Sequence, residues 1–407
     1  MKSALYRARV AVRSWWVWGL CWAICLQPLW LRAAETSQTV FLEYVESSNQ
    51  VQNVALQLEA KSGAFPKEPE FGQRKLERGT LKFGNDSKNA VPFVWDYTQG
   101  KLYLDLNRNG NLTDDPAGVF SCPVSRVDQS FDGYCSQNFD HVRISVSTPA
   151  GTQTILMDLN LYRWSRNVNA SARVRSFWQG KVDLQGQAWQ VGWLPSLNGP
   201  IGGTNGVMLL RPWLVREKTF STHDGTLQIF NFSRQLFFQK QAYQLEMAWV
   251  EQGRAPHYQI TFAPQTVALG ELKLSGKYIQ RLMLDQGSHF KAIVDAPAAT
   301  LSIPAGTYSQ ISVHLKQGAS EASRDADRST MSVTVNAQKT ANLVVGGPLT
   351  NSVTVQRRGS AMLSFNYQLL GADGHAYRRL GVNQSEPPQV TISQGGKQIA
   401  SGKFQYG

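Results

Sequence analysis

Residues 363–369 read Leu-Ser-Phe-Asn-Tyr-Gln-Leu, with an apolar side chain at every second position. Because successive side chains of a β-strand point to opposite faces, this alternation predicts a strand with one buried face and one exposed face. Residues 311–315, Ile-Ser-Val-His-Leu, repeat the pattern. Beyond residue 34 we find no apolar spacing typical of an amphipathic helix longer than two turns. The sequence therefore predicts strands and hardly any helix.

Turn signals that contain glycine separate the expected strands at short intervals. They are Asn109-Gly110, Asp132-Gly133, Asp224-Gly225, Asp373-Gly374 and Gly395-Gly396. Such pairs favour tight turns between antiparallel strands, because glycine adopts positive φ at little steric cost. Many short strands joined in this way predict an all-β fold, with an N-terminal antiparallel β domain followed by two small β-sandwiches.

The composition changes along the chain and indicates where the domains end. A length of 407 residues suits two or three domains. After the N-terminal leader, tryptophan occurs only between Trp95 and Trp249. We therefore expect a β-rich domain at 35–265, a small sandwich at 266–345 and a last sandwich at 346–407. In the alternative, the last segment completes the sandwich before it.

Parts of the chain, and the chain as a whole, resemble known proteins. Residues 300–308, Thr-Leu-Ser-Ile-Pro-Ala-Gly-Thr-Tyr, resemble the strand–turn–strand of transthyretin-like and carboxypeptidase-regulatory-like domains. Those domains are accessory sandwiches, so the resemblance implies a fold and no chemistry. The last segment is expected to be Ig-like, closing with a hairpin between Pro388 and Tyr406. As a whole, the chain resembles secreted bacterial multi-domain β proteins that carry no assigned activity.

The N-terminus has the pattern of a secretory signal peptide. Residues 2–13 carry four basic residues, Ser14 to Leu31 carry no charge and are rich in Trp and Leu, and Ala33-Ala34 follow. We expect residues 1–34 to be removed on export. The alternative is an uncleaved anchor, because the 18 uncharged residues can just span a bilayer. We expect no membrane span after the leader, and a secreted, periplasmic or cell-surface protein.

The charge balance bears on the partner of the chain. The formal net charge is +12, and the leader, with five basic residues and no acid, carries +5 of it. The remaining +7 is spread over 373 residues without a basic run, which is not typical of a nucleic-acid-binding protein. We therefore expect an extracellular polymer or a protein as the partner, and no nucleic acid.

Cysteine usage also bears on the compartment. Of the four cysteines, Cys21 and Cys25 lie in the leader, so Cys122 and Cys135 remain after cleavage. An even pair in an exported protein predicts a disulfide. Closing so short a loop would stabilise the fold by about 3 kcal/mol in the chain-entropy model. The alternative is a pair of thiols.

One motif carries a chemical mechanism. Residues 105–115 read Asp-Leu-Asn-Arg-Asn-Gly-Asn-Leu-Thr-Asp-Asp, which matches the D-x-[DN]-x-[DN]-G start of a calcium loop. The stretch resembles the loops of dockerins and EF-hands, although strand-like flanks surround it and Pro116 replaces the usual bidentate Glu. The resemblance implies a calcium site made by Asp105, Asn107, Asn109, Asn111 (through its backbone carbonyl), Asp114 and Asp115.

Two interpretations of this loop stay open. A calcium ion would bind with a dissociation constant of roughly 0.1–1 mM, as in extracellular modules, and would have a structural role. In the alternative, Asn109-Gly110 is a tight hairpin turn whose neighbours are polar because they are exposed.

The sequence contains none of the common catalytic or nucleotide-binding motifs. G-x-S-x-G, H-E-x-x-H, the P-loop and G-x-G-x-x-G do not occur. Glu43 and Glu46 are three residues apart and fall on opposite faces of a strand, which makes a poor acid pair. Trp189 and Trp193 share one strand face, which is either core or a stacking surface for a flat ligand. The Gly199–Gly206 stretch is expected to form a loop beside that surface.

Two functions compete on these grounds. The first is an exported, non-catalytic β-sandwich protein, a surface, matrix or ligand-binding component with a structural calcium loop. The alternative is a secreted, glycoside-type hydrolase whose catalytic domain lies in residues 35–265.

Overall fold

A computed structural model describes the chain in thirteen segments. They are residues 36–48, 51–122, 134–148, 151–165, 167–201, 204–214, 220, 227–250, 257–287, 289–325, 331–359, 362–380 and 389–403. Strands make up 68% of the structure and no helix reaches seven residues, which confirms the all-β fold class. The short 3-10 turns η1 (Ser87–Asn89) and η2 (Pro116–Gly118) lie between strands. Across these segments, we find no helix with the length and apolar character needed to cross a membrane.

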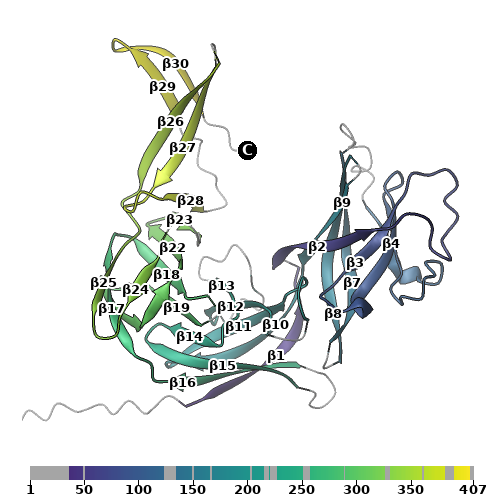
Figure 1. The fold of residues 1–407 in the computed structure, drawn as a ribbon, viewed down its shortest axis with the longest axis horizontal. Helices are drawn as coiled ribbons and strands as arrows, with labels where there is room; N and C mark the ends of the chain where they lie inside the picture. Colours follow the sequence, from purple (N-terminus) through teal and green to yellow (C-terminus); the bar gives the residue numbers. More distant parts are fainter. Residues whose placement is uncertain are drawn as a thin grey trace, which may run out of the picture. The chain divides into compact units, whose positions relative to one another are not determined.

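An antiparallel sheet of eight strands forms the first part of the fold (Figure 1). Its spatial order is β6-β5-β4-β3-β2-β9-β8-β7. The strands are β2 (Gln52–Ala60), β3 (Glu77–Lys82), β4 (Ala90–Asp96), β5 (Lys101–Leu104), β6 (Val119–Ser121), β7 (Tyr134–Thr148), β8 (Gly151–Trp164) and β9 (Asn167–Val174). Alternate residues of these strands are buried in one core that includes Phe93, Trp95, Phe139 and Leu159.

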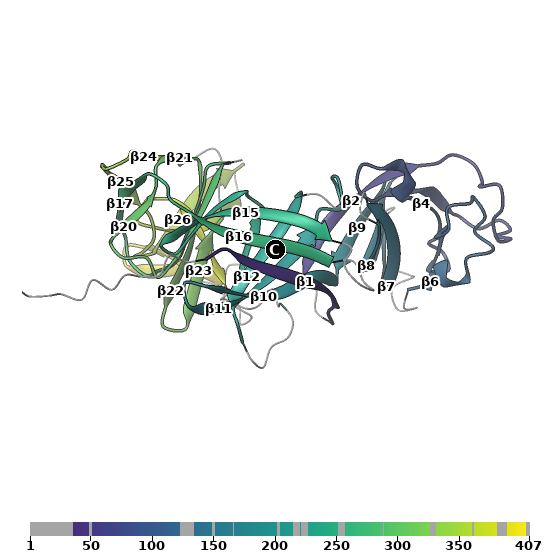
Figure 2. The same cartoon turned by 90° about the horizontal axis from the view of Figure 1, so that it is seen from below.

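A second sheet joins fifteen strands in one hydrogen-bonded order, from β13 at one end to β26 at the other. The order is β13-β12-β11-β10-β1-β16-β15-β14-β19-β18-β22-β23-β28-β27-β26. Its first eight strands are β13 (Gln228–Asn231), β12 (Gly206–Pro212), β11 (Gln187–Pro195), β10 (Ser176–Leu184), β1 (Gln38–Glu46), β16 (His257–Gln265), β15 (Gln241–Val250) and β14 (Gln235–Phe238). The remaining seven are β19 (Phe290–Asp295), β18 (Ile279–Asp285), β22 (Gln310–Gln317), β23 (Ser320–Arg324), β28 (Ala376–Leu380), β27 (Met362–Leu370) and β26 (Thr350–Arg358). Figure 2 shows β10, β1, β16 and β15 side by side.

Short strands complete the C-terminal part. They are β17 (Leu269–Ser275), β20 (Thr300–Pro304) and β25 (Thr340–Val344) in one sheet, β21 (Gly306–Tyr308) and β24 (Val333–Val335) in a second, and β29 (Gln389–Gln394) and β30 (Lys397–Lys403) in a third. The apolar side chains of β17, β20, β21, β24 and β25, with those of β18, β19 and β22, form a core that contains Leu272, Leu284, Ile303 and Val313. Thus strand and turn alternate in residues 300–308 as expected.

The domain boundaries stay predictions from composition. Strand pairing crosses the expected boundary after residue 265, because β14 pairs in parallel with β19. It also crosses the one after residue 345, because β23 pairs with β28. The leader, the turns Asp132-Gly133 and Asp224-Gly225, and both named ends of the C-terminal hairpin lie outside the described residues.

Candidate functional site

The calcium-type loop, residues 105–115, connects β5 to the turn η2 in the eight-stranded sheet. Asp105 follows the buried Leu104 directly, and its own side chain is fully buried. The backbone N–H of Asp105 donates to the carbonyl oxygen of Pro92 at 2.9 Å, so the start of the loop extends the β-sheet pairing. The sheet therefore holds the first candidate ligand in a fixed position.

The Asp105 carboxylate organises the turn. Its Oδ1 accepts a hydrogen bond from the backbone N–H of Asn109 at 3.1 Å, and its Oδ2 accepts one from Gly110 at 2.7 Å. Gly110 has a φ of 79°, a conformation that glycine adopts without strain. The motif position that the sequence assigned to a sharp turn is thus a sharp turn.

The three asparagines form a chain of short hydrogen bonds along the loop. The side-chain oxygen of Asn107 accepts from the N–H of Asn109, that of Asn109 from Asn111, and that of Asn111 from Thr113, at 3.0, 2.7 and 3.1 Å. The amide oxygens of Asn107 and Asn109 each have a second lone pair, so each could bind a cation while this backbone hydrogen bond stays intact. The Asn111 oxygen already accepts a second hydrogen bond, from the Thr113 hydroxyl at 2.6 Å.

The same three amides converge on one carboxylate. The Asp114 oxygens accept hydrogen bonds from the Nδ2 groups of Asn107, Asn109 and Asn111, at 3.2, 2.8 and 2.9 Å. These hydrogen bonds, that from Asn109 above all, hold the pKa of the Asp114 carboxyl below its usual value. Asp114 is therefore charged at neutral pH and lies at the centre of the candidate ligands.

Asp115 lies in a less favourable environment for its charge. Burial raises the pKa of its carboxyl, and the negative charges of Asp105 and Asp114 add to the increase. Its Oδ2 accepts a hydrogen bond from the N–H of Leu106 at 3.1 Å, and backbone hydrogen bonds from Asn107 and Leu106 partly offset the rise in pKa. A bound cation would relieve this repulsion between the carboxylates.

Neighbouring segments hold the loop in place. The backbones of Lys67 and Asn111 form an isolated parallel β-bridge, and the N–H of Leu112 donates to the Lys67 carbonyl at 3.0 Å. Leu112 is buried with Phe65, Phe71 and Val94 in a small apolar cluster. On the other side, the Arg108 guanidinium donates to the carbonyl of Ser145 on β7. The loop is thus fixed at both sides by the eight-stranded sheet and its connections.

The chemical type of these ligands fits a hard cation, but the side chains form hydrogen bonds with one another. Carboxylate and amide oxygens are the ligands that calcium prefers. Among the described residues, however, no three His, Cys, Asp or Glu side chains come together as a preformed metal cluster. Binding an ion would require Asp114 and Asp115 to exchange hydrogen bonds for ion contacts, while Asp105 stays fixed by the backbone N–H groups of Asn109 and Gly110.

The disulfide prediction is wrong for this structure. Cys122, just after β6, and Cys135, on β7, are both buried in the core of the eight-stranded sheet, but they form no disulfide and do not lie at bonding distance. Burial raises the pKa of the Cys135 thiol, and the nearby Cys122 adds to the increase. An even number of cysteines does not by itself bring two sulfurs to bonding distance.

We expect the two thiols to resist alkylation in the folded protein. Burial shields both sulfurs from the reagent, and the raised pKa of Cys135 lowers its fraction of thiolate, which is the reactive form. Peptide mapping after treatment with iodoacetamide, without reductant, should show Cys122 and Cys135 modified only when urea is present. Recovery of a peptide that joins the two residues would contradict this prediction.

The tryptophan pair belongs to a core and not to a stacking surface. The side chains of Trp189 and Trp193 on β11 are 3% and 0% exposed, among the buried residues of β1, β10, β12 and β16. Trp193 packs edge-to-face against Phe232 and Tyr258, with ring centroids 5.8 and 6.1 Å apart. The spacing of the two tryptophans is compatible with a core or with a stacking surface, and the structure shows both side chains buried in a core.

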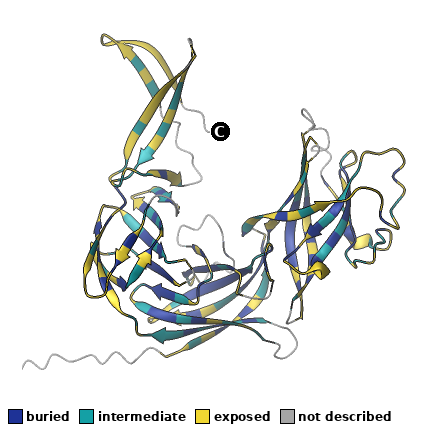
Figure 3. Cartoon of the chain, viewed as in Figure 1, coloured by how far each residue is buried: buried dark blue, intermediate teal, exposed yellow. Residues whose placement is uncertain are grey.

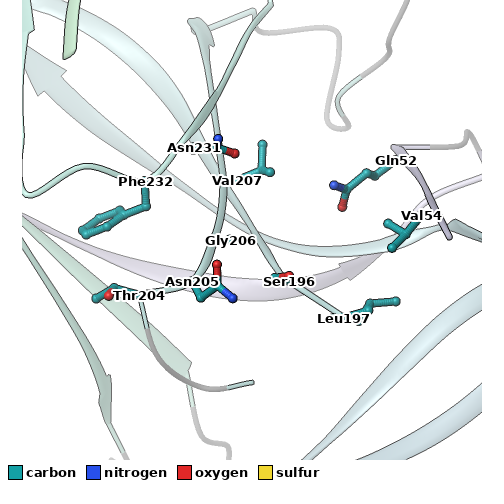
Figure 4. Close-up of a pocket in the computed structure, with 10 residues that line it drawn as sticks. All are labelled: Gln52, Val54, Ser196, Leu197, Thr204, Asn205, Gly206, Val207, Asn231 and Phe232. Carbon is teal, nitrogen blue, oxygen red and sulfur yellow. The ribbon is translucent and has the colours of Figure 1, made fainter. Parts of the chain in front are cut away.

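A polar pocket of about 320 Å3 lies beside β12, where β2 and the end of β11 approach it (Figure 4). Its lining residues carry amide, hydroxyl and apolar groups and no charge: Gln52, Val54, Ser196, Leu197, Thr204, Asn205, Gly206, Val207, Asn231 and Phe232. Figure 4 shows the Gln52 amide directed toward the space between Gln52 and Val207. Sequence reasoning missed this pocket, although it placed a loop at Gly199–Gly206, the stretch that ends at the lining residue Gly206.

Three acids of the N-terminal region pair with arginines and not with one another. Glu46 forms an ion pair with Arg143 at 2.7 Å on the surface. The buried carboxylates of Asp96 and Asp158 likewise accept hydrogen bonds from Arg74 and Arg175. These carboxylates face bases instead of one another, so they cannot share the work of acid and nucleophile.

Comparisons of the chain with protein-family models, with curated proteins and with solved structures give no match. The likenesses of residues 105–115 and 300–308 to known families therefore stay predictions.

Proposed function

We propose that this chain is an exported, non-catalytic ligand-binding β protein whose fold is stabilised by calcium at residues 105–115. The observation that carries the proposal is the convergence of three asparagine amides on Asp114, beside the buried Asp105. The loop concentrates three carboxylates and three amide oxygens in eleven consecutive residues. That composition suits a divalent cation with oxygen ligands, and an ordinary hairpin turn does not require so many carboxylate and amide groups.

The leader supports export. Export in turn suits the proposed site, because calcium sites of this affinity are filled only where calcium is at millimolar concentration. A basic segment, an uncharged segment and two alanines precede the first described residue. The compartment and the proposed affinity thus agree with each other.

The pocket beside β12 supports ligand binding over hydrolysis. Amide and hydroxyl groups without a charged neighbour suit a neutral, hydroxyl-rich ligand such as a segment of a polysaccharide, which can both accept and donate hydrogen bonds. A glycosidase would need two carboxyl groups across such a pocket, and its described lining contains none. The pocket therefore favours a binding role.

Calcium titration of the purified protein tests the proposal. At an ion concentration ten times its dissociation constant, binding to the folded state alone adds about 1.4 kcal/mol of stability, which raises the melting temperature by a few degrees. We expect this shift with 1 mM calcium, and a smaller one with 1 mM magnesium, because magnesium requires shorter and more regular coordination.

The matched control replaces charge and keeps shape. Asp114→Asn plus Asp115→Asn removes two negative charges from the loop, so the shift with calcium should disappear while the melting temperature without calcium changes little. If calcium leaves the wild-type melting temperature unchanged, or if the double variant responds as the wild type does, calcium has no place in this loop.

A further inference from the structure

The strand at one end of the fifteen-stranded sheet has a free edge. In the part of the chain that the structure describes, β26 pairs only with β27. β27 in turn pairs with β28 only at Leu369 and Leu370, so most of the β26–β27 hairpin is two-stranded. A two-stranded hairpin is marginally stable in water unless a further strand or layer supports it.

Other edge strands of the two large sheets are short or protected against pairing. β6 has three residues and β13 has four. β7 is long, but it contains Asp140 and Arg143, has an irregular register between Phe139 and Val142, and receives the Arg108 guanidinium at Ser145. Charges, bulges and shortness are the usual means by which proteins prevent edge-to-edge pairing.

β26 has none of these protections over most of its length. It has nine residues, Thr-Asn-Ser-Val-Thr-Val-Gln-Arg-Arg, and pairs with β27 without a register shift. Residues 350–356 contain no charge and no proline. An uncharged, regular, unpaired edge of this kind is suited to accept another strand.

One face of the hairpin is apolar and partly uncovered. Val353 pairs with Tyr367 and Val355 with Phe365, so the four side chains share a face. Val353 and Val355 are 44% and 52% exposed, and Figure 3 shows the two strands largely in the colours of exposed and intermediate residues. Pairing at the edge would extend this face and cover part of it.

We propose that two copies of this chain associate by antiparallel pairing of β26 with β26, with Thr354 facing Thr354. The sequence of the strand is self-complementary in this register. Val353 of each copy then faces Val355 of the other, which makes two apolar cross-strand pairs on one face. On the opposite face, Ser352 lies across from Gln356.

The charges at the end of the strand permit this arrangement. In this register Arg357 of one copy faces the neutral Asn351 of the other, so arginines do not face each other. The two Arg357 positions are offset by six residues, about 20 Å along the strands, which exceeds the Debye length of about 8 Å at physiological ionic strength. The proposed pairing is independent of calcium and of the pocket beside β12.

The mass of the purified full chain in solution tests this inference. We expect sedimentation equilibrium to give twice the mass of one chain at micromolar concentration. Val353→Lys plus Val355→Lys places two pairs of like charges across the interface, and should give the mass of one chain. Ile229→Lys, at a 47% exposed position on β13, is the matched control and should leave the dimer unchanged.

A charge-complementary variant tests the register itself. With Val353→Glu plus Val355→Lys, each glutamate faces a lysine of the other copy, so this variant should again be a dimer. A monomeric wild type, a double-lysine variant that stays dimeric, or a glutamate–lysine variant that is monomeric would each overturn the proposed pairing. Unchanged melting temperatures of the variants would show that the folded state is preserved.

Discussion

Trp193→Ala is expected to lower the free energy of unfolding by about 3–5 kcal/mol, the range observed for removing a large buried aromatic side chain. The ring of Trp193 is 0% exposed. An added Cβ at Gly206 would lie only 2.5 Å from its ring atoms, which shows how tightly β12 packs over it. The protein cannot close a cavity of that size without moving β12. Urea unfolding at constant pH measures the difference.

Trp213→Ala supplies the matched control for this prediction. Trp213 lies just beyond the end of β12, is 41% exposed and has the Lys181 ammonium 5.7 Å from its ring centroid. Its loss should cost less than about 1 kcal/mol. If Trp193→Ala were equally mild, the ring would not be part of the core, and the stacking-surface interpretation would return.

These two tryptophans illustrate what a strand pattern can predict. Alternation placed Trp189 and Trp193 on one face, and the structure agrees. It could not say whether another layer covers that face, because burial depends on strands distant in sequence, such as β1 and β16. The all-β class was predictable because it needs only local periodicity, whereas the parallel pairing of β14 with β19 is a long-range contact without a local signal.

The loop shows the same limit at the scale of a site. Its spacing predicted the sharp turn at Gly110, and it predicted Asp105 as a calcium ligand but not as the acceptor that holds the turn. It gave no reason to place Asp114, rather than Asp115, among the asparagine amides, since both are adjacent carboxylates. It also could not predict that Arg108 reaches Ser145, because that contact depends on where β7 lies. The disulfide prediction failed for the same reason, because an even number of cysteines does not determine the distance between their sulfurs.

Asp105→Ala is expected to be the most damaging single change in the loop, and its effect should have two separable parts. Without calcium, the substitution leaves the N–H group of Gly110 without its acceptor, whereas that of Asn109 keeps the Asn107 side-chain oxygen. An unsatisfied donor that is shielded from water costs about 1–3 kcal/mol, so we expect a loss in that range in urea unfolding with a chelator present. Asp105→Asn keeps one acceptor oxygen and should lose about half as much.

The second part concerns the ion alone. Both substitutions remove the buried negative charge, so both should abolish the stabilisation by 1 mM calcium, even though Asp105→Asn keeps much of the turn. A loss below about 0.5 kcal/mol for Asp105→Ala in chelator would mean that the loop opens without affecting the sheet. A calcium response that survives in Asp105→Asn would remove Asp105 from the ligand set, because a carboxylate held by two backbone N–H groups would then serve the turn and not the ion.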